Sequence, residues 1–114
     1  MPGADALALV YATFPTLEEA ERIGGELVER RLAACVNIIP GMISIYIWQG
    51  AKHREQETVI LIKTRQALAD DVVAQVRALH SYDNPAVIII PIAGGSADFL
   101  QWIAAQTAAT AAGP

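Results

Sequence analysis

The side chains that could bind a metal ion or handle protons fall in two short stretches of the sequence. In the segment HSYDNP, His80 is followed closely by Tyr82 and Asp83, and in the segment EQETVILIKT, Glu55 and Glu57 lie two residues apart. A neutral imidazole is a common metal ligand, and carboxylate oxygens are further ligands for divalent cations. The sequence therefore offers two sources of metal ligands.

Each of these groups also has a structural interpretation. His80 falls where a helix is expected to end, and a protonated histidine at that position gains roughly 0.3–1 kcal/mol from the helix dipole. From spacing alone, a histidine that caps the helix in a polar turn is favoured over a metal ligand. Glu55 and Glu57 share one face of an expected strand, where a solvated edge that discourages wrong strand pairing is favoured over a cation site.

The single cysteine, Cys35, excludes an internal disulfide and suits a reducing cytoplasm, which is the location we expect. It lies in an apolar stretch, so a small core residue is favoured over a reactive thiolate. No nucleophile, base and orienting group come together by spacing, and there is no Cys-x-x-Cys pair, His-x-x-x-His pair or glycine-rich phosphate loop. We therefore expect a protein that is not an enzyme.

The composition indicates one compact domain with an excess of apolar surface. The 114 residues fit a single domain, with an ordered core at about 6–104 and a tail at 105–114. The hydrophobic content is 54%, against about 45–50% in typical globular domains. Scattered basic residues and a net charge of −4 argue against nucleic-acid binding, and no apolar run reaches the ~18 residues of a membrane span. We expect the excess apolar surface to lie at a subunit interface.

Hydrophobic periodicity predicts the order βαββαβ with a further helix at the end. The strands are expected at 6–14, 33–50, 55–64 and 86–92, with a bend at Pro40-Gly41 and a polar turn at 49–54. One helix is expected from Leu17, a second at 66–79, and a third after Ser96, which would be its N-cap. Thr16 and Glu19 have the spacing of a capping box, in which each side chain bonds to the other residue's amide. Gly24 and Gly25 fall inside the first helix, where close packing on the sheet would explain them. This order indicates the α+β class with a ferredoxin-like antiparallel sheet.

The stretch 33–50 is too long for its own domain. At about 3.3 Å per residue it would span ~50 Å, whereas a domain of this size is only ~30 Å across. The last three strands are also apolar on both faces, and leaving five or six such side chains in water would forfeit on the order of 10 kcal/mol. That is comparable with the whole stability of a domain. The sequence therefore predicts an obligate oligomer that covers the open sheet face.

Several spaced motifs run from about Leu7 to Trp102. They are LAACVN at 32–37, Pro40-Gly41, Ser44-Ile45-Tyr46 with Trp48 and Gly50, Lys63-Thr64, His80-Ser81-Tyr82 with Pro85, and FLQW at 99–102. In this order they resemble the CutA family of divalent-cation tolerance proteins. The resemblance implies a cytoplasmic homotrimer in which the long hairpin strands join sheets between neighbours, and a metal site that uses His80 and an acidic residue near Glu57. A cysteine at the end of the first strand, proposed as a copper ligand in some members, is missing, and Ala12 stands at its position.

Two hypotheses follow for the function. The first is a non-enzymatic homotrimer that binds a divalent metal ion through His80 and Glu57, with copper(II) bound best by the general affinity order. The alternative is a signalling module that binds a small molecule or a protein in a cleft between subunits. In that case the loop 49–54 and the turn 80–84 would form a pocket for an anionic metabolite, with Lys52, Arg54 and Lys63 as its cations.

Overall fold

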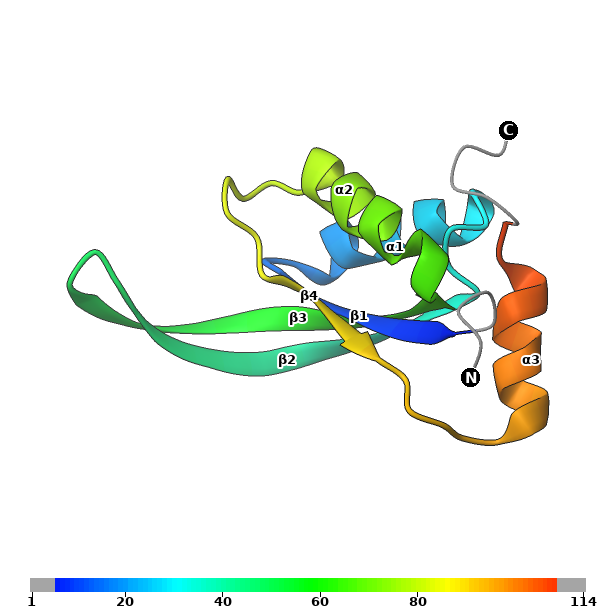
Figure 1. The fold of residues 1–114 in the computed structure, drawn as a ribbon. Coiled ribbons are helices and arrows are strands. Elements are labelled where there is room, and N and C mark those ends of the chain that lie inside the picture. The colour runs from blue at the N-terminus through cyan, green and yellow to red at the C-terminus, as the bar shows by residue number, and fades with distance from the viewer. Residues whose placement is uncertain (1–5, 109–114) are drawn as a thin grey trace.

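A four-stranded antiparallel sheet forms the body of the protein, described here from a computed structural model that covers residues 6–108. The elements are β1 (Leu7–Phe14), α1 (Leu17–Glu29), β2 (Cys35–Trp48), β3 (Ala51–Arg65), a 3-10 turn η2 (Gln66–Leu68), α2 (Ala69–Leu79), β4 (Val87–Pro91) and α3 (Ala97–Gln106). The strand order is β2-β3-β1-β4. Helices α1 and α2 lie on one face of the sheet, and α3 lies at the end away from the β2–β3 hairpin tip (Figure 1). The predicted ferredoxin-like class is confirmed.

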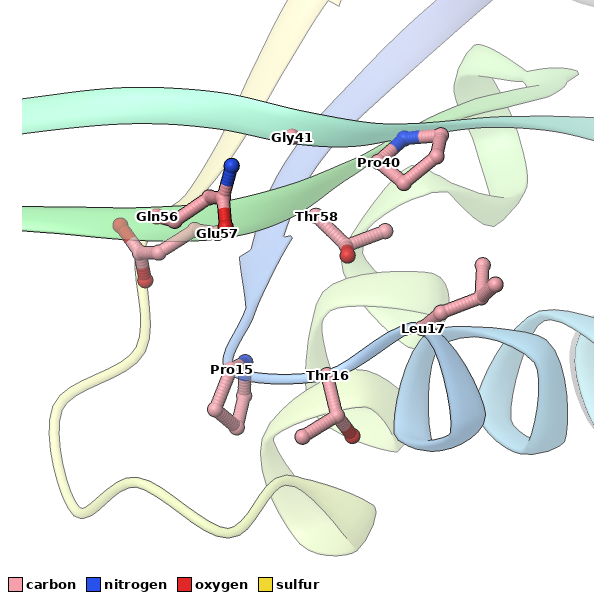
Figure 2. A pocket seen from close by; sticks show the side chains of 8 residues that line it. All are labelled: Pro15, Thr16, Leu17, Pro40, Gly41, Gln56, Glu57 and Thr58. Atoms are coloured by element: carbon pink, nitrogen blue, oxygen red, sulfur yellow. The ribbon is translucent and has the colours of Figure 1, made fainter.

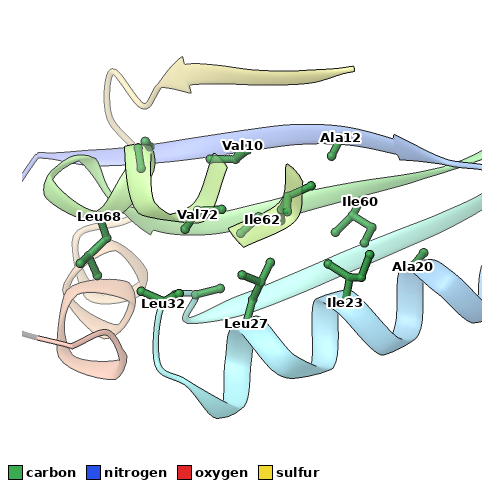
Figure 3. Close-up of a cluster of buried hydrophobic side chains, with 14 of the residues drawn as sticks. Val10, Ala12, Ala20, Ile23, Leu27, Leu32, Ile60, Ile62, Leu68 and Val72 are labelled. Atoms are coloured by element: carbon green, nitrogen blue, oxygen red, sulfur yellow. The ribbon is translucent and has the colours of Figure 1, made fainter. Parts of the chain in front are cut away.

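The hydrophobic core lies between the sheet and these two helices (Figure 3). On β1, Ala8, Val10 and Ala12 alternate with outward residues and have no exposed surface. The larger side chains that pack against β1 come from β3, α1, η2 and α2; they are Ile60, Ile62, Ile23, Leu27, Leu68, Val72 and Val76. Burying each large aliphatic side chain contributes about 1.5–3 kcal/mol, so this layer fixes the end of β1 relative to the start of α1.

Helix α1 begins with half of the predicted capping box. The Thr16 hydroxyl accepts a hydrogen bond from the Glu19 amide at 3.1 Å, as expected. The reciprocal half is wrong, because the Glu19 carboxylate accepts hydrogen bonds from the amide and the hydroxyl of Ser81, each at 3.0 Å. The segment after α2 passes the start of α1 and offers two donors in place of one. Glu19 therefore connects two elements instead of closing its own helix.

The β2–β3 hairpin closes in two residues, so the predicted polar turn at 49–54 is wrong. Gln49 and Gly50 have φ values of 51° and 82°, the pair of positive values that a type I′ turn requires. Strand β3 begins at Ala51 and runs through the polar residues 52–56. The polar character of these residues led to the prediction of a turn. They belong to an exposed part of the hairpin, where a strand needs no apolar face.

The predicted bend at Pro40-Gly41 is a bulge that changes which side chains of β2 face the helices. Before it, Val36 and Ile38 pair with β3 residues of the core; after a register shift between Ile39 and Met42, Ile45 and Ile47 take the helix-side face. The hairpin extends beyond the helices (Figure 1), and these two isoleucines are 62% and 67% exposed. The molecule accordingly measures 44 × 29 × 22 Å.

The opposite face of the sheet is covered at one end, where Ile103 of α3 forms a second buried cluster with Leu7 and Ala34. Over the rest of this face, no helix of residues 6–108 covers the strands. Its exposed apolar side chains include Ile39, Ile88 and Ile90, at 51%, 53% and 43% exposure. The strands therefore present apolar residues to both faces, as the sequence predicts. Among the described residues, no helix is long and apolar enough to cross a membrane.

The C-terminal helix is tied to the sheet at its end. The Arg65 guanidinium donates to the Thr107 hydroxyl at 3.0 Å and to the carbonyl of Ala108. Helix α3 runs to Gln106, slightly past the predicted core boundary, and the rest of the predicted tail, 109–114, lies outside the described residues. Ser96 occupies the predicted N-cap position, but its side chain makes no capping hydrogen bond.

The two glycines inside α1 differ in their surroundings. A Cβ at Gly24 would lie 3.0 Å from Cγ2 of Val36, whereas a Cβ at Gly25 would have no neighbour within 4 Å. The predicted close packing on the sheet is therefore confirmed for Gly24 and wrong for Gly25.

This difference gives a matched pair of substitutions. Gly25→Ala should raise the free energy of unfolding by about 0.5–1 kcal/mol, because alanine restricts the unfolded chain and meets nothing in the fold. Gly24→Ala should lower it by about 1–3 kcal/mol, because Val36 must shift. Denaturant unfolding at equal protein concentration measures both, and equal effects at the two positions would contradict the packing described.

Candidate functional site

His80 sits at the end of α2 with its side chain completely buried. Its backbone amide donates to the carbonyl of Val76 at 2.9 Å, so it occupies the predicted capping position. The imidazole has no exposed surface and stacks on Phe14, with ring centroids 4.6 Å apart. The polar turn predicted after His80 is present, with residues 81–84 irregular and exposed, but the His80 side chain itself is covered by the end of β1.

Both nitrogens of the His80 ring have hydrogen-bond partners. Nε2 lies 2.7 Å from the carbonyl oxygen of Thr13, and Nδ1 accepts from the amide of Tyr82 at 3.0 Å. A carbonyl only accepts and an amide only donates, so these partners assign the neutral ring with its hydrogen on Nε2. Ligation of a metal ion by His80 requires one of these bonds to open.

Glu57 is the second buried titratable group at this end of the sheet. It is 8% exposed and accepts from the Tyr82 hydroxyl at 3.4 Å. In the β2–β3 register Glu57 stands opposite Met42 and Glu55 stands opposite Ser44, so the two carboxylates share a face as predicted. The interpretation of Glu57 as part of a solvated edge is wrong, because Tyr82 from the segment after α2 reaches it.

Two phenols accompany the two carboxylates. Burial raises the pKa of Tyr82 to about 12, and the charges of Glu57 and Glu55 act in the same direction. The hydrogen bond to Glu55, at 2.5 Å, is the main cause that raises the pKa of Tyr46 to about 12. The Tyr46 ring also stacks on His53, with centroids 5.3 Å apart. Both phenols therefore remain protonated at neutral pH and act as hydrogen-bond donors to the carboxylates.

The cluster of Glu55, Glu57, Tyr46 and Tyr82 has acceptors in excess and, among residues 6–108, no cationic partner. Within residues 6–108, the ion pair is Arg30 with Glu26, and Glu19 lies 3.5 Å from the neutral ring of His80; neither contact includes Glu55 or Glu57. In the same part of the chain, no three His, Cys, Asp or Glu side chains are grouped closely enough to hold a metal ion. Tyr82 links the two predicted ligands, with its ring 4.9 Å from the His80 ring and its hydroxyl on Glu57. Their role as metal ligands stays a prediction.

An open pocket of about 250 Å³ lies beside Glu57, where the β2 bulge meets the turn into α1 (Figure 2). It is lined by Pro15, Thr16, Leu17, Pro40, Gly41, Gln56, Glu57 and Thr58. The prolines and the leucine supply apolar walls, and the threonines, the glutamine and the glutamate supply polar groups. Sequence reasoning missed this pocket, although the predicted bend at Pro40-Gly41 marked one wall.

The other predicted groups lie elsewhere. Cys35 is a free, half-buried cysteine that stands opposite Lys63 in the β2–β3 register, so it is not a fully buried core residue. The Lys63 ammonium donates to Asn37 at 2.5 Å and lies 5.2 Å from the ring centroid of Phe99. A cytoplasmic location stays a prediction.

Within one protomer, the structure does not bring the hairpin tip to the turn 80–84. Tyr82 of that turn contacts Glu57, and Gly50 at the tip is about 23 Å further along β3 at 3.3 Å per residue. The predicted pocket between them therefore requires a second copy of the chain.

Ser81, His80 and Glu19 contain the residue types of a catalytic triad but not its geometry. The Ser81 hydroxyl donates to Glu19 rather than to His80, and the Nε2 of His80 faces the Thr13 carbonyl. A triad needs the imidazole within hydrogen-bond reach of the nucleophile, in order to remove its proton. This arrangement does not activate Ser81.

Comparison with known proteins identifies the family. Residues 8–106 match the family described as CutA1 divalent ion tolerance protein. The chloroplastic protein CutA 1 of rice, Oryza sativa subsp. japonica, is 42% identical over 99 residues, which are 87% of this chain and 56% of the rice protein. The divalent-cation tolerance protein CutA of Thermus thermophilus is 43% identical over 99 residues, which are 87% of this chain and 96% of that protein. The chain thus spans little more than half of the rice relative's length.

Solved structures show the same fold. The crystal structure of CutA1 from Oryza sativa has a TM-score of 0.87 and 41% identity, and the match covers 90% of this chain and 94% of that one. The divalent cation tolerance protein from Thermus thermophilus has a TM-score of 0.86 and 42% identity, with 90% and 99% covered. With the family match over residues 8–106 and this agreement in fold, the chain belongs to the CutA1 family of divalent ion tolerance proteins.

Proposed function

We propose that this protein takes part in divalent-cation tolerance by binding a divalent metal ion at Glu57. The observation that carries the proposal is a carboxylate that is 8% exposed and forms no ion pair within the described residues. A buried carboxylate is costly unless a positive charge or several donors compensate it. A divalent cation supplies that charge and coordinates oxygen directly. Membership of a divalent ion tolerance family supports the same function.

His80 is the proposed nitrogen ligand. It becomes available when the segment after α2 shifts, because the amide of Tyr82 then leaves Nδ1. An imidazole and a carboxylate suit copper(II), which the general affinity order also places highest among the divalent first-row metals. Two ligands do not complete a copper site, so the remaining ones come from water or from a second copy of the chain.

The proposed assembly is a homotrimer, and the proposed location is the cytoplasm. Exposed isoleucines on the open sheet face and on the hairpin support an assembly, because each such side chain gains about 1.5–3 kcal/mol on burial. A single free cysteine suits a reducing compartment.

A small-molecule ligand is the second candidate, and the pocket beside Glu57 favours it. At about 250 Å³ the pocket is just below the usual range of ligand sites, which begins at roughly 300 Å³. Its apolar walls and its one carboxylate suit a small cationic molecule, rather than the anionic metabolite expected from the loop 49–54.

The metal site is tested by calorimetry with copper(II). Glu57→Gln and His80→Ala should each weaken binding by tenfold or more, because each removes a proposed ligand. Glu21→Gln serves as the matched control, since it removes an exposed carboxylate from α1. Copper uptake by both variants at the affinity of the parent would show the assignment to be wrong.

The contact between Glu57 and Tyr82 has a separate optical test. In Glu57→Gln the pKa of the Tyr82 phenol should fall part of the way from about 12 toward 10, since burial, the largest cause, remains. The raised pKa stabilises the folded protein fully below pH 10, and this contribution disappears as the pH rises to 12. Alkaline difference spectra in a Tyr46→Phe background measure the shift, and an unchanged midpoint would contradict the contact.

The assembly is tested by light scattering. The parent should scatter as a trimer at micromolar concentration, and the double variant Ile45→Lys and Ile47→Lys should dissociate, because both side chains are exposed in the protomer. Val28→Lys, at an exposed apolar position of α1, is the control and should stay assembled. A folded monomeric parent would overturn the proposed assembly.

A further inference from the structure

The part of the β2–β3 hairpin that extends beyond the helices (Figure 1) has one face on which cations accompany apolar side chains. In the β2–β3 register, Ile45 stands opposite Arg54 and Ile47 stands opposite Lys52, so all four share this cationic face. All four residues are exposed, and neither cation forms an ion pair within residues 6–108. Such a surface suits a partner that offers apolar contact and negative charge together.

The other face of the same hairpin offers that combination. It carries Glu55, which is exposed, together with the rings of Tyr46 and Trp48, which are 38% and 51% exposed. The hydrogen bond from the Tyr46 hydroxyl holds the Glu55 carboxylate on this acidic face and leaves its charge in place. Glu57 is on the same face but is buried and contacted by Tyr82, so Glu55 is the carboxylate that another molecule can reach.

We propose that the cationic face of one hairpin docks on the acidic face of the hairpin of a second copy of this chain. Arg54 or Lys52 of one copy then pairs with Glu55 of the next. The isoleucines of the first copy pack on the aromatic rings of the second, which buries both apolar surfaces. This inference rests on the proposed function, because it specifies a contact within the proposed homotrimer.

The distribution of charge disfavours a two-fold contact between hairpins. In a two-fold contact the same patch meets itself, so that Lys52 and Arg54 would face the same two cations, or Glu55 would face Glu55. Like charges that face each other across an interface cost affinity. A contact between unlike faces is heterologous, and such contacts close into a ring when the rotation between copies allows it. A trimer is a ring of this kind.

The apolar and charged groups have separate roles in this contact. In open water an ion pair between such side chains is weak, because water and salt screen it. Between two hairpins the pair is enclosed by isoleucines and aromatic rings, whose burial supplies the affinity, while the charges select which faces meet. Reversal of one charge should therefore weaken the contact, and reversal of both charges should restore it.

The first test is a charge-reversal cycle followed by light scattering over a dilution series. Arg54→Glu and Glu55→Arg should each raise the concentration at which the assembly is half dissociated by about tenfold or more, because each places like charges across the contact. The variant with both substitutions should dissociate closer to the parent than either single variant does. Arg77→Glu, at an exposed position of α2, is the matched control for Arg54→Glu and should dissociate as the parent does.

The second test identifies the faces that meet. In a Cys35→Ala background, Arg54→Cys and Glu55→Cys each place one thiol on one face of the hairpin. A short bis-maleimide should link the two variants to each other when they are co-expressed, and each variant expressed alone should lose these links.

The outcomes separate this contact from the assembly itself. Links within Arg54→Cys alone that equal those of the co-expressed pair would overturn the proposal, because they would show like faces in contact. An assembled parent whose dissociation is unchanged by both charge reversals would also overturn it and leave the proposed homotrimer intact. A folded monomeric parent would instead overturn the homotrimer.

Discussion

The two main helices cover one face of the sheet, whereas α3 covers only the end of the other face, and the other features of the molecule follow from that asymmetry. The two main helices bury the inner side chains of β1 and β3, whereas the outer face retains exposed isoleucines on β2 and β4. A hairpin that extends past the helices adds more exposed apolar surface (Figure 1). Apolar surface of this extent costs free energy in water, which is the reason for the proposal that other chains cover it.

The same core also creates the candidate site. Because α1 and α2 pack beside each other on the sheet, the start of α1 and the end of α2 come together over the end of β1. His80, Ser81 and Tyr82 leave α2 at this junction and contact three elements in succession. Tyr82 then covers a carboxylate on β3 that would otherwise face solvent. The buried Glu57 is thus a consequence of helix packing, and the absence of a cationic partner for it within the described part of the chain gives the candidate site its acidic character.

The bulge at Pro40-Gly41 determines how the exposed isoleucines of the hairpin and the carboxylates of the candidate site are distributed over the two faces of the hairpin. It exchanges the faces of β2, so that Met42 stands opposite Glu57 while the isoleucines of the hairpin turn to the other face. A regular strand would place these isoleucines on the face of the carboxylates. The bulge therefore separates an apolar surface from an acidic one along a single hairpin, and it forms one wall of the pocket (Figure 2).

Local patterns in the sequence determined the kinds and order of the elements. Hydrophobic periodicity, the Thr16 cap and the bend at Pro40-Gly41 indicated the ferredoxin-like class and the uncovered face, because each is a property of neighbouring residues. Only the tertiary structure decided the partners of the site: Glu19 and Ser81 are 62 residues apart, His80 and Thr13 are 67 apart, and Tyr82 and Glu57 are 25 apart. The burial of His80 and Glu57 and the acceptor role of Glu19 depend on these contacts between residues that are far apart in the sequence. No local pattern specifies them, since the same residues at the same spacing would be solvated if the helices packed elsewhere.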